Sequence, residues 1–201
     1  MAGDELLPRY ARKKAQTRQR IYQAALELFA KHGLTATTVD QITARADVAK
    51  GTFFNYFRSK EQVFAYFIEL QLGRVGEALA AVQQGRPVRP VLRRAFQRLG
   101  GEIGGSPKLA QALIAAIIGN EIARETVATG MRQGRQRLAR IFALGQAQGQ
   151  IRADCQPAAM GLAFQQAVLG ALMVWAIHPQ IQLARRLQAA FEDYWKSIEA
   201  A

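Results

Sequence analysis

The feature that most constrains this chain is a short segment, residues 37–57, whose residue order predicts two small helices separated by a tight turn. Thr38 is followed three residues later by Gln41, the pattern of a capping box, so a helix should begin just after Thr38. Its apolar stripe ends near Asp47. A turn of about three residues, opened by Val48, then leads into a second helix. Two short helices joined in this way form a helix-turn-helix arrangement.

The second of these helices has two faces of different chemistry. Phe53 and Phe57 lie four residues apart and should enter the same core. The other side chains offer a cation, a hydroxyl, an amide and aromatic rings to the outside: Lys50, Thr52, Phe54, Asn55 and Tyr56. Such groups can contact the phosphates and base edges of a DNA major groove.

A longer helix is predicted to precede the pair and to support it, beginning at Thr17. Its apolar residues recur at the spacing of one buried helix face: Ile21, Ala24, Ala25, Leu28 and Phe29. Lys31 and His32 followed by Gly33 are typical of a helix end, which gives His32 a structural rather than a catalytic role. Residues 17–60 therefore read as a three-helix DNA-binding domain.

The rest of the chain, residues 61–201, is predicted to be a second domain made only of helices. The helical segments are 60–84, begun by a capping box at Ser59 and Gln62, then 91–100, 108–120, 125–148, a helix capped by Asp154 and ending near His178, and a last helix to about Glu199. The last helix carries a seam of Ala184, Leu187, Phe191, Tyr194 and Ile198. No alternating strand pattern of useful length appears, so the fold class is all-α.

The charge of the chain indicates an anionic partner. Of the 201 residues, 27 are Lys or Arg and 15 are Asp or Glu, which gives a net charge of +12 and a pI near 10.5. Residues 1–16 form a basic arm, continued by Arg18 and Arg20, for which both phosphate contact and plain solvation remain open.

The composition argues against an enzyme and against a bound metal or other cofactor. Cys155 is the only cysteine, and the histidines are His32 and His178, which excludes a disulfide scaffold and a cysteine-based zinc site. Paired carboxylates, metal-ligand spacings and a phosphate-cradling glycine loop after a strand are also missing from the sequence.

Segments that would target the chain to a membrane are not expected either. The N-terminus is polar and basic, unlike a signal peptide. The apolar run from Ala163 to Ile177 is broken by Gln165 and Gln166 and is shorter than the ~20 residues that span a bilayer. We therefore expect a cytoplasmic protein with no membrane partner.

The N-terminal third resembles the TetR family of one-component transcriptional regulators. The resemblance covers about residues 15–65 and consists of the Thr-Thr-Val entry at 37–39, Val48 in the turn, Lys-Gly-Thr at 50–52, and Tyr-Phe-x-x-Lys-Glu at 56–61. Beyond residue 65 only the architecture is similar. One departure is Phe54, where the family usually has a tyrosine that can donate to a phosphate.

The resemblance implies a homodimer that binds a pseudo-palindromic double-stranded DNA operator and responds to a small-molecule inducer, most commonly as a repressor. Thr38, Lys50, Tyr56 and Lys60 are then assigned to phosphates, and Thr52, Phe54 and Asn55 to bases. Gln41 and Arg45 are weaker candidates for base contact.

In this family the C-terminal half binds the inducer and forms the dimer. We predict a pocket between helices, lined by Phe67, Gln71, Phe96, Ile114, Ile117, Phe142, Phe164, Gln165, Val168 and Trp175. The predicted dimer contacts are Gly161, Gly170, Ala171, Leu187, Phe191, Tyr194 and Trp195. Asn120 could add a polar group to the pocket. The cluster Arg132, Arg135, Arg137 and Arg140 is either a solvated face or the partner of an anionic inducer.

Three other functions remain as alternatives. The first is an architectural DNA-binding protein, which would use the same helix-turn-helix domain without a ligand pocket. The second alternative is an all-helical enzyme. The third is a protein that binds a membrane surface through the basic arm. If the chain is a ligand-responsive regulator, we expect helix 60–84 to tilt on ligand binding and to move the two recognition helices of a dimer out of register.

Overall fold

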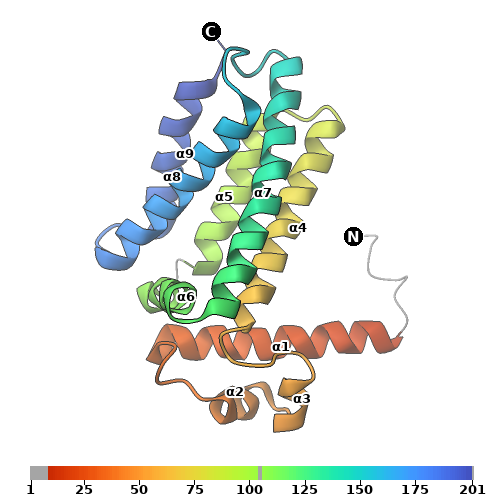
Figure 1. Cartoon of the computed structure of the whole chain (residues 1–201), viewed down its shortest axis with the longest axis vertical. Helices are drawn as coiled ribbons and strands as arrows, with labels where there is room; N and C mark the ends of the chain where they lie inside the picture. The colour runs from red at the N-terminus through yellow and green to blue at the C-terminus, as the bar shows by residue number, and fades with distance from the viewer. Residues whose placement is uncertain (1–8, 104–105, 201) are drawn as a thin grey trace.

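The computed structural model describes residues 9–103 and 106–200, and this part of the chain folds into helices (Figure 1). The helices are α1 (Arg9–His32), α2 (Val39–Ala46), α3 (Lys50–Phe54), α4 (Val63–Gln83), α5 (Val88–Ile103), α6 (Pro107–Gly119), α7 (Glu121–Ala147), α8 (Pro157–Ile177) and α9 (Leu183–Ile198). The only extended pairing in the described residues is one isolated bridge between Ile151 and Glu199. The predicted all-α class is confirmed.

Helices α1 to α3 form a small unit at one end of the molecule, with α1 lying across the base of the bundle made by the later helices (Figure 1). The capping box at Thr38 is present: the Gln41 N–H donates to Thr38 Oγ1 at 3.2 Å, and the Thr38 N–H donates to Gln41 Oε1 at 2.8 Å. Helix α2 ends as predicted at Asp47, which adopts a left-handed conformation with φ of 51°. Phe53 is fully buried.

Helix α1 is longer than predicted, because it begins at Arg9 rather than Thr17. Part of the basic arm is therefore helical, and only residues 1–8 of the arm lie outside the described residues. Arg, Lys, Gln and Ala are good helix formers, so this segment can extend the helix without a buried face of its own. The predicted end is correct: Gly33 has φ of 82° and its N–H donates to the Phe29 carbonyl at 2.9 Å.

The predicted capping box at Ser59 is wrong. Gln62 Oε1 accepts the N–H of Arg58 at 2.9 Å instead of that of Ser59, and residues 59–62 form a turn. Helix α4 consequently begins at Val63 and not at Lys60.

Three further helix starts differ from the prediction. Helix α5 begins at Val88 and includes Pro90 in its first turn, where a proline lacks no needed hydrogen bond. Helix α7 begins early because Asn120 Oδ1 accepts the Ala123 N–H at 2.9 Å, so Asn120 is a cap and not a pocket residue. Asp154 does not cap α8; it binds the guanidinium of Arg152 at 2.5 Å, and this ion pair lowers the pKa of Asp154.

Helix α8 is 21 residues long, so the prediction of an apolar run too short to span a membrane is wrong on length. By length and composition this helix is long and apolar enough to cross a bilayer, as the buried core helices of soluble proteins also can be. Its residues Met160, Phe164, Leu172 and Trp175 are buried, and α8 packs against α6, α7 and α9.

Helix α9 turns its apolar face into the chain's own core. Leu187, Phe191 and Trp195 are each at most 3% exposed and form a row with Leu183 and Ile198 against α5 and α8. These three side chains are not accessible to a partner, which corrects their assignment to a dimer interface. The predicted seam is correct for Leu187, Phe191 and Ile198, but Ala184 is exposed and Tyr194 is only half-buried.

The other predicted dimer residues divide between the core and the surface. Gly161 is buried where α8 crosses α7, and a Cβ there would lie 3.1 Å from the Arg135 carbonyl oxygen, so its small size serves packing within the chain. Tyr194 is half-buried, donates to the Met160 carbonyl at 2.7 Å, and has its pKa raised by burial. Gly170 is exposed and Ala171 half-buried.

Candidate DNA-binding surface and ligand cavity

The recognition surface, defined as the outer side of α2, α3 and residues 55–56, carries most of the side chains predicted to contact DNA. Phe54 is 48% exposed and meets the buried Phe53 edge-on, with ring centroids 5.4 Å apart. Asn55 is exposed, and Thr52 and Tyr56 are half-buried. Helix α3 is shorter than predicted, so Asn55 is its C-cap and Tyr56 follows it.

The charged side chains of the recognition surface form weak, solvent-exposed ion pairs. Lys50 Nζ lies 2.8 Å from Asp40 Oδ1, and an Arg45 guanidinium nitrogen lies 2.7 Å from Glu27 Oε2. Exposed pairs of this kind contribute only about 0.2–1 kcal/mol, so a phosphate could replace the carboxylate at low cost.

Lys60 behaves differently from Lys50. Its ammonium group donates to the carbonyls of Leu34, Thr35 and Thr37 at 2.7, 3.2 and 2.7 Å. All three of its donors are thus used inside the protein. The geometry favours a role for Lys60 in holding the loop between α1 and α2 rather than in binding phosphate.

Two arginines of the basic region also have internal roles that the sequence did not reveal. Arg20 donates to the carbonyls of Ala46 and Asp47, both at 2.7 Å, and so closes the turn after α2. Arg18 forms a bidentate ion pair with Glu69 on α4 at 2.8 and 3.1 Å. Nothing in their local sequence distinguishes them from the neighbouring solvated cations.

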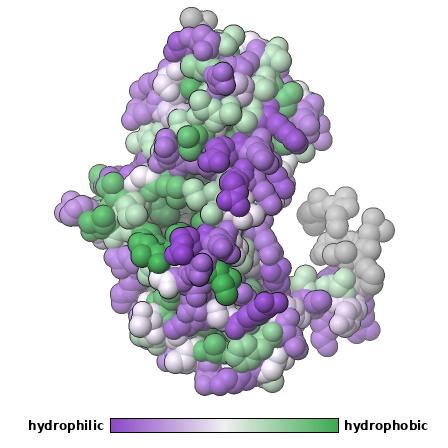
Figure 2. Space-filling view, in the orientation of Figure 1, coloured by the Kyte–Doolittle hydropathy of each residue, from purple (hydrophilic) through white to green (hydrophobic). Residues whose placement is uncertain are grey.

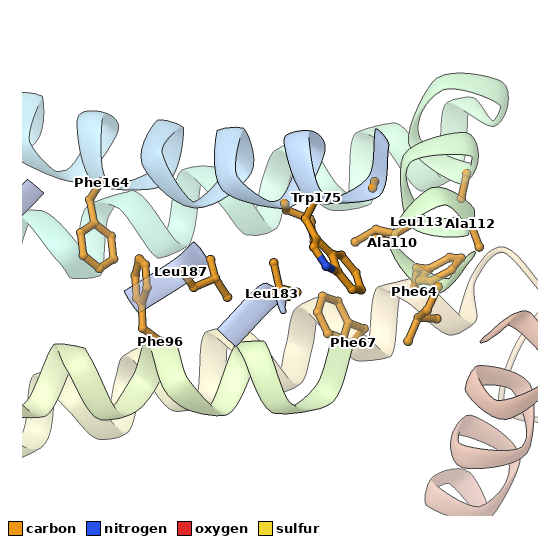
Figure 3. Close-up of a cluster of buried hydrophobic side chains, with 14 of the residues drawn as sticks. Phe64, Phe67, Phe96, Ala110, Ala112, Leu113, Phe164, Trp175, Leu183 and Leu187 are labelled. Carbon is orange, nitrogen blue, oxygen red and sulfur yellow. The ribbon is translucent and has the colours of Figure 1, made fainter. Parts of the chain in front are cut away.

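A cavity of about 200 Å³ lies among α4, α5, α6, α7 and α8. Its walls are predominantly apolar. Seven of the residues predicted for a pocket line it: Phe67, Gln71, Phe96, Ile117, Phe164, Gln165 and Val168. Figure 3 shows Phe96 and Phe164 facing each other across the bundle, with ring centroids 4.6 Å apart.

Three predicted pocket residues do not line this cavity. Phe142 and Trp175 are buried packing residues, at 0% and 3% exposure, and Ile114 is half-buried against the core. Apolar spacing alone cannot separate a side chain that packs against another side chain from one that borders a void.

Two glycines on α7 line the cavity, and they are absent from the predicted pocket residues. A Cβ on Gly130 would lie 2.1 Å from Ile68 Cγ2, and one on Gly134 would lie 3.5 Å from Gln165 Nε2. Their spacing of four residues places both on the side of α7 that faces α4. A pair of glycines at helical spacing inside a long helix was the available signal.

Polar groups in the cavity come from two glutamines and one arginine. Gln165 Nε2 donates to the Met131 carbonyl at 2.7 Å, while Gln165 Oε1 is buried without a hydrogen-bond partner among the described residues. Arg74 donates to Gln71 Oε1 at 3.2 Å. A buried acceptor without a donor is costly, so a ligand that donates a hydrogen bond to Gln165 would be favoured.

The predicted arginine cluster on α7 does not enter the cavity. Arg132 and Arg140 are exposed, Arg135 is half-buried, and the half-buried Arg137 donates to the Leu72 carbonyl on α4. Among the described residues, the arginine that lines the cavity is Arg74 of α4.

Residues 21–67, which contain the whole helix-turn-helix, match the sequence profile of bacterial regulatory proteins of the tetR family. This region of the chain belongs to the TetR family.

Relatives with this N-terminal region include the regulator AcrR of Shigella flexneri, 31% identical over 42% of this chain and 40% of that protein. The chain therefore spans less than half of AcrR. The match to the regulator AcuR of Cereibacter sphaeroides is longer: it covers 78% of this chain and 75% of that protein, at 27% identity. The chain likewise spans less than half of YerO of Bacillus subtilis and TcmR of Streptomyces glaucescens.

Solved structures of TetR-family repressors have the same fold over nearly the whole chain. SmeT of Stenotrophomonas maltophilia, in a complex with triclosan, superposes with a TM-score of 0.71 at 23% identity over 92% of each chain. FadR of Thermus thermophilus, in a complex with lauroyl-CoA, has a TM-score of 0.62 at 28% identity over 88% of this chain and 92% of that one.

Two helices of this TetR-family chain connect the cavity wall with α1. From α4, which lines the cavity through Phe67, Phe64 stacks on Phe29 with ring centroids 5.4 Å apart. From the start of α6, Ser106 Oγ donates to the Ala30 carbonyl at 2.8 Å and Lys108 Nζ to the Lys31 carbonyl at 2.9 Å. The sequence predicts the first of these connections but not the second.

Helix α8 leaves one apolar face uncovered. The side chains on this face are between 41% and 63% exposed: Leu162, Leu169, Met173, Val174 and Ile177. Their spacing keeps them on one side of the helix. Figure 2 shows apolar side chains gathered where the C-terminal end of α8 approaches α6.

Proposed function

We propose that this chain is a DNA-binding transcriptional repressor that acts as a homodimer and releases its operator when a small, largely apolar ligand enters the cavity. The observation that carries the proposal is that one helix, α4, lines the cavity through Phe67 and packs on the DNA-binding unit through Phe64. A ligand that changes the position of α4 therefore acts on the unit that would hold the DNA. We place this activity in the cytoplasm.

For DNA recognition we propose two sets of contacts. Thr38, Lys50 and Tyr56 bind phosphates, because they combine a helix N-terminus, an exposed cation and a phenol. Thr52, Phe54 and Asn55 meet base edges, with Phe54 positioned for apolar contact to a thymine methyl group. Gln41 and Arg45 are secondary candidates at the edge of the same surface. Lys60 is left out because its donors are already used.

The exposed face of α8 is our candidate for the dimer interface. A two-fold axis would place this face against the same face of a second copy, and it would also give two recognition surfaces for a palindromic DNA site. Gly170 and Ala171 lie on α8 between Leu169 and Met173 and would permit close approach of the two helices. This assignment keeps two of the residues predicted from the sequence and replaces the buried ones.

The ligand response rests on differential binding. A ligand shifts the equilibrium only by binding one arrangement of α4 and α6 more tightly than the other. Filling a cavity lined by Phe67 and Ile117 acts on both helices at once, because the first residue is on α4 and the second on α6. The complex of the related FadR with lauroyl-CoA, whose acyl chain is apolar, supports a ligand with an apolar part in a protein of this fold.

The first experiment is selection of duplexes from a randomised pool, repeated across salt concentrations. A repressor dimer should enrich a pseudo-palindrome and show a steep salt dependence. Salt-sensitive binding without sequence enrichment would instead favour the architectural alternative. The selected duplex then serves to test release by added apolar compounds, which the architectural alternative does not predict.

The dimer interface is tested by the double variant Leu169→Glu, Met173→Glu. It should sediment as a monomer and lose operator affinity, because two carboxylates cannot be buried against their symmetry copies. The matched control is Ala143→Glu, Ala147→Glu on the exposed side of α7, which should remain dimeric. A dimer that persists in the first variant would contradict the α8 interface.

A further inference from the structure

A second hollow, which we call the arginine groove, lies on the surface between α4 and α5. Its volume is about 300 Å³. Arg74, Arg86, Arg94 and Arg98 line it around a floor of alanine, proline and valine side chains, and Glu77 is the one acidic residue among its lining residues. Neither the DNA-binding surface nor the proposed dimer face includes this groove.

The positive charge of the arginine groove is only partly neutralised. Two of the four guanidinium groups have partners: Arg98 lies 3.4 Å from Glu77, and Arg74 donates to Gln71 Oε1 at 3.2 Å. The side chains of Arg86 and Arg94 are exposed, and within residues 9–103 and 106–200 neither has a hydrogen-bond or ion-pair partner. Two guanidinium groups that line one groove without carboxylate partners form a site suited to a multiply charged anion, above all to phosphate, which guanidinium groups bind bidentately.

The arginine groove adjoins the apolar cavity. Arg74, Ala78 and Ala95 line both hollows. Between the groove and the cavity, α4 and α5 therefore each contribute an alanine, whose methyl group is a small barrier. A ligand could thus extend an apolar tail between α4 and α5 into the cavity while its charged end stays in the groove at the surface.

We propose that the arginine groove binds the phosphate-bearing head of an amphipathic ligand whose tail occupies the cavity. This inference rests on the proposed function and specifies the chemical class of its ligand. A simple carboxylate needs only one arginine, whereas several guanidinium groups around one groove match a head with more than one phosphate charge. The cavity is somewhat larger than the ~150 Å³ that accommodates benzene, so the tail is of medium length.

The test compares three probes by calorimetry at physiological salt on the full chain: octanoyl-coenzyme A, octanoate and coenzyme A. Octanoyl-coenzyme A carries both halves of the proposed ligand, and the other two carry one half each. The wild-type chain should bind octanoyl-coenzyme A at least about tenfold more tightly than either half, since linking two binding modules gains affinity.

The variant that addresses the groove is Arg86→Gln, Arg94→Gln. Both side chains are exposed, so the fold should be preserved, which thermal unfolding checks. Its affinity for octanoyl-coenzyme A should fall by about tenfold, and its affinity for octanoate by less than about twofold. The control Arg140→Gln, Arg185→Gln removes the same charge from exposed arginines outside both hollows and should change neither affinity.

Three outcomes would overturn the inference. The groove variant could bind octanoyl-coenzyme A as well as the control does, or the wild-type chain could fail to bind it at all. The groove variant could also lose duplex affinity instead, which would make the groove part of a DNA-binding surface. In each case the proposed function would still be tested separately, by selection of an operator duplex and by release of that duplex when uncharged apolar compounds are added.

Discussion

Helices α1–α3 are joined by hydrogen bonds that close the turns between them, whereas helices α4–α8 surround a cavity and include a buried amide oxygen without a partner among the described residues. The turn after α1 is held by Lys60, and the turn after α2 by Arg20. In the second region, Gln165 lines an apolar space of about 200 Å³, and its buried Oε1 has no hydrogen-bond partner among the described residues. The first region is therefore built to keep one geometry, and the second has room to adapt to a ligand.

The difference shows how one chain can combine a rigid surface with a responsive one. A shift in the position of the recognition helix changes operator affinity only if the helix moves without deforming. A cavity that accepts a ligand requires the opposite, since its walls must gain contacts when it fills. Helices α4 and α6 touch both regions, and they are where the two requirements meet.

The largest expected effect is a difference between the two regions in how much stability is lost when a large apolar side chain is truncated. Phe53→Ala should lower the free energy of unfolding by about 3–5 kcal/mol and abolish operator binding, because Phe53 is fully buried beneath the recognition surface. Ile117→Ala should cost only about 1–2 kcal/mol and keep operator binding, since Ile117 is half-buried and already borders a void. Chemical denaturation and duplex titration measure both, and equal costs would contradict the comparison.

The next effect tests whether Lys60 is structural. Lys60→Met keeps the aliphatic stem but removes the ammonium group from three carbonyls, and it should cost about 1.5–3 kcal/mol of stability. The salt dependence of operator binding should keep its slope, because no phosphate contact is lost. A slope reduced by about one, with unchanged stability, would restore Lys60 to the phosphate-binding set.

The sequence was sufficient for the first region because its signals are local. The capping box at Thr38 and the end of α1 at Gly33 depend on residues a few positions apart, and both are present in the structure. The partners of Arg20 and Lys60 are more than 20 residues away, and no local pattern indicates them. Arg20 was therefore left open between solvent and phosphate on its charge, and Lys60 was assigned to phosphate from the family resemblance.

In the second region the sequence predicted which residues are apolar but not what they face. Phe142 and Phe164 are both buried aromatic residues, yet only Phe164 borders the cavity. The same limit misplaced the dimer contacts, because the exposed apolar face belongs to α8 and the buried seam to α9. The direction of a helix face is decided by long-range packing, which short-range spacing does not contain.

A smaller effect on stability is expected from replacing Gln165, whose side-chain oxygen has no hydrogen-bond partner among the described residues. Gln165→Leu removes a buried acceptor without a partner together with one hydrogen bond to the Met131 carbonyl, so stability should stay level or rise by up to about 1 kcal/mol. Ligands that donate a hydrogen bond should lose affinity, and purely apolar ligands should not. Thermal unfolding and ligand titration measure the two effects. A clear loss of stability would mean that this polar group supports the fold, as those of the first region do.

The smallest expected change in stability belongs to Lys50, whose ion pair with Asp40 is exposed on both sides. Lys50→Gln should alter the free energy of unfolding by less than about 0.5 kcal/mol. If Lys50 binds a phosphate, the slope of log affinity against log salt should nevertheless fall by about one per protomer, uniformly across duplex sequences. Lys60→Met provides the opposite pattern, a stability loss without a change of slope. If the two lysine variants gave the same pattern, the division between cations that hold the DNA-binding unit together and cations that meet DNA would fail.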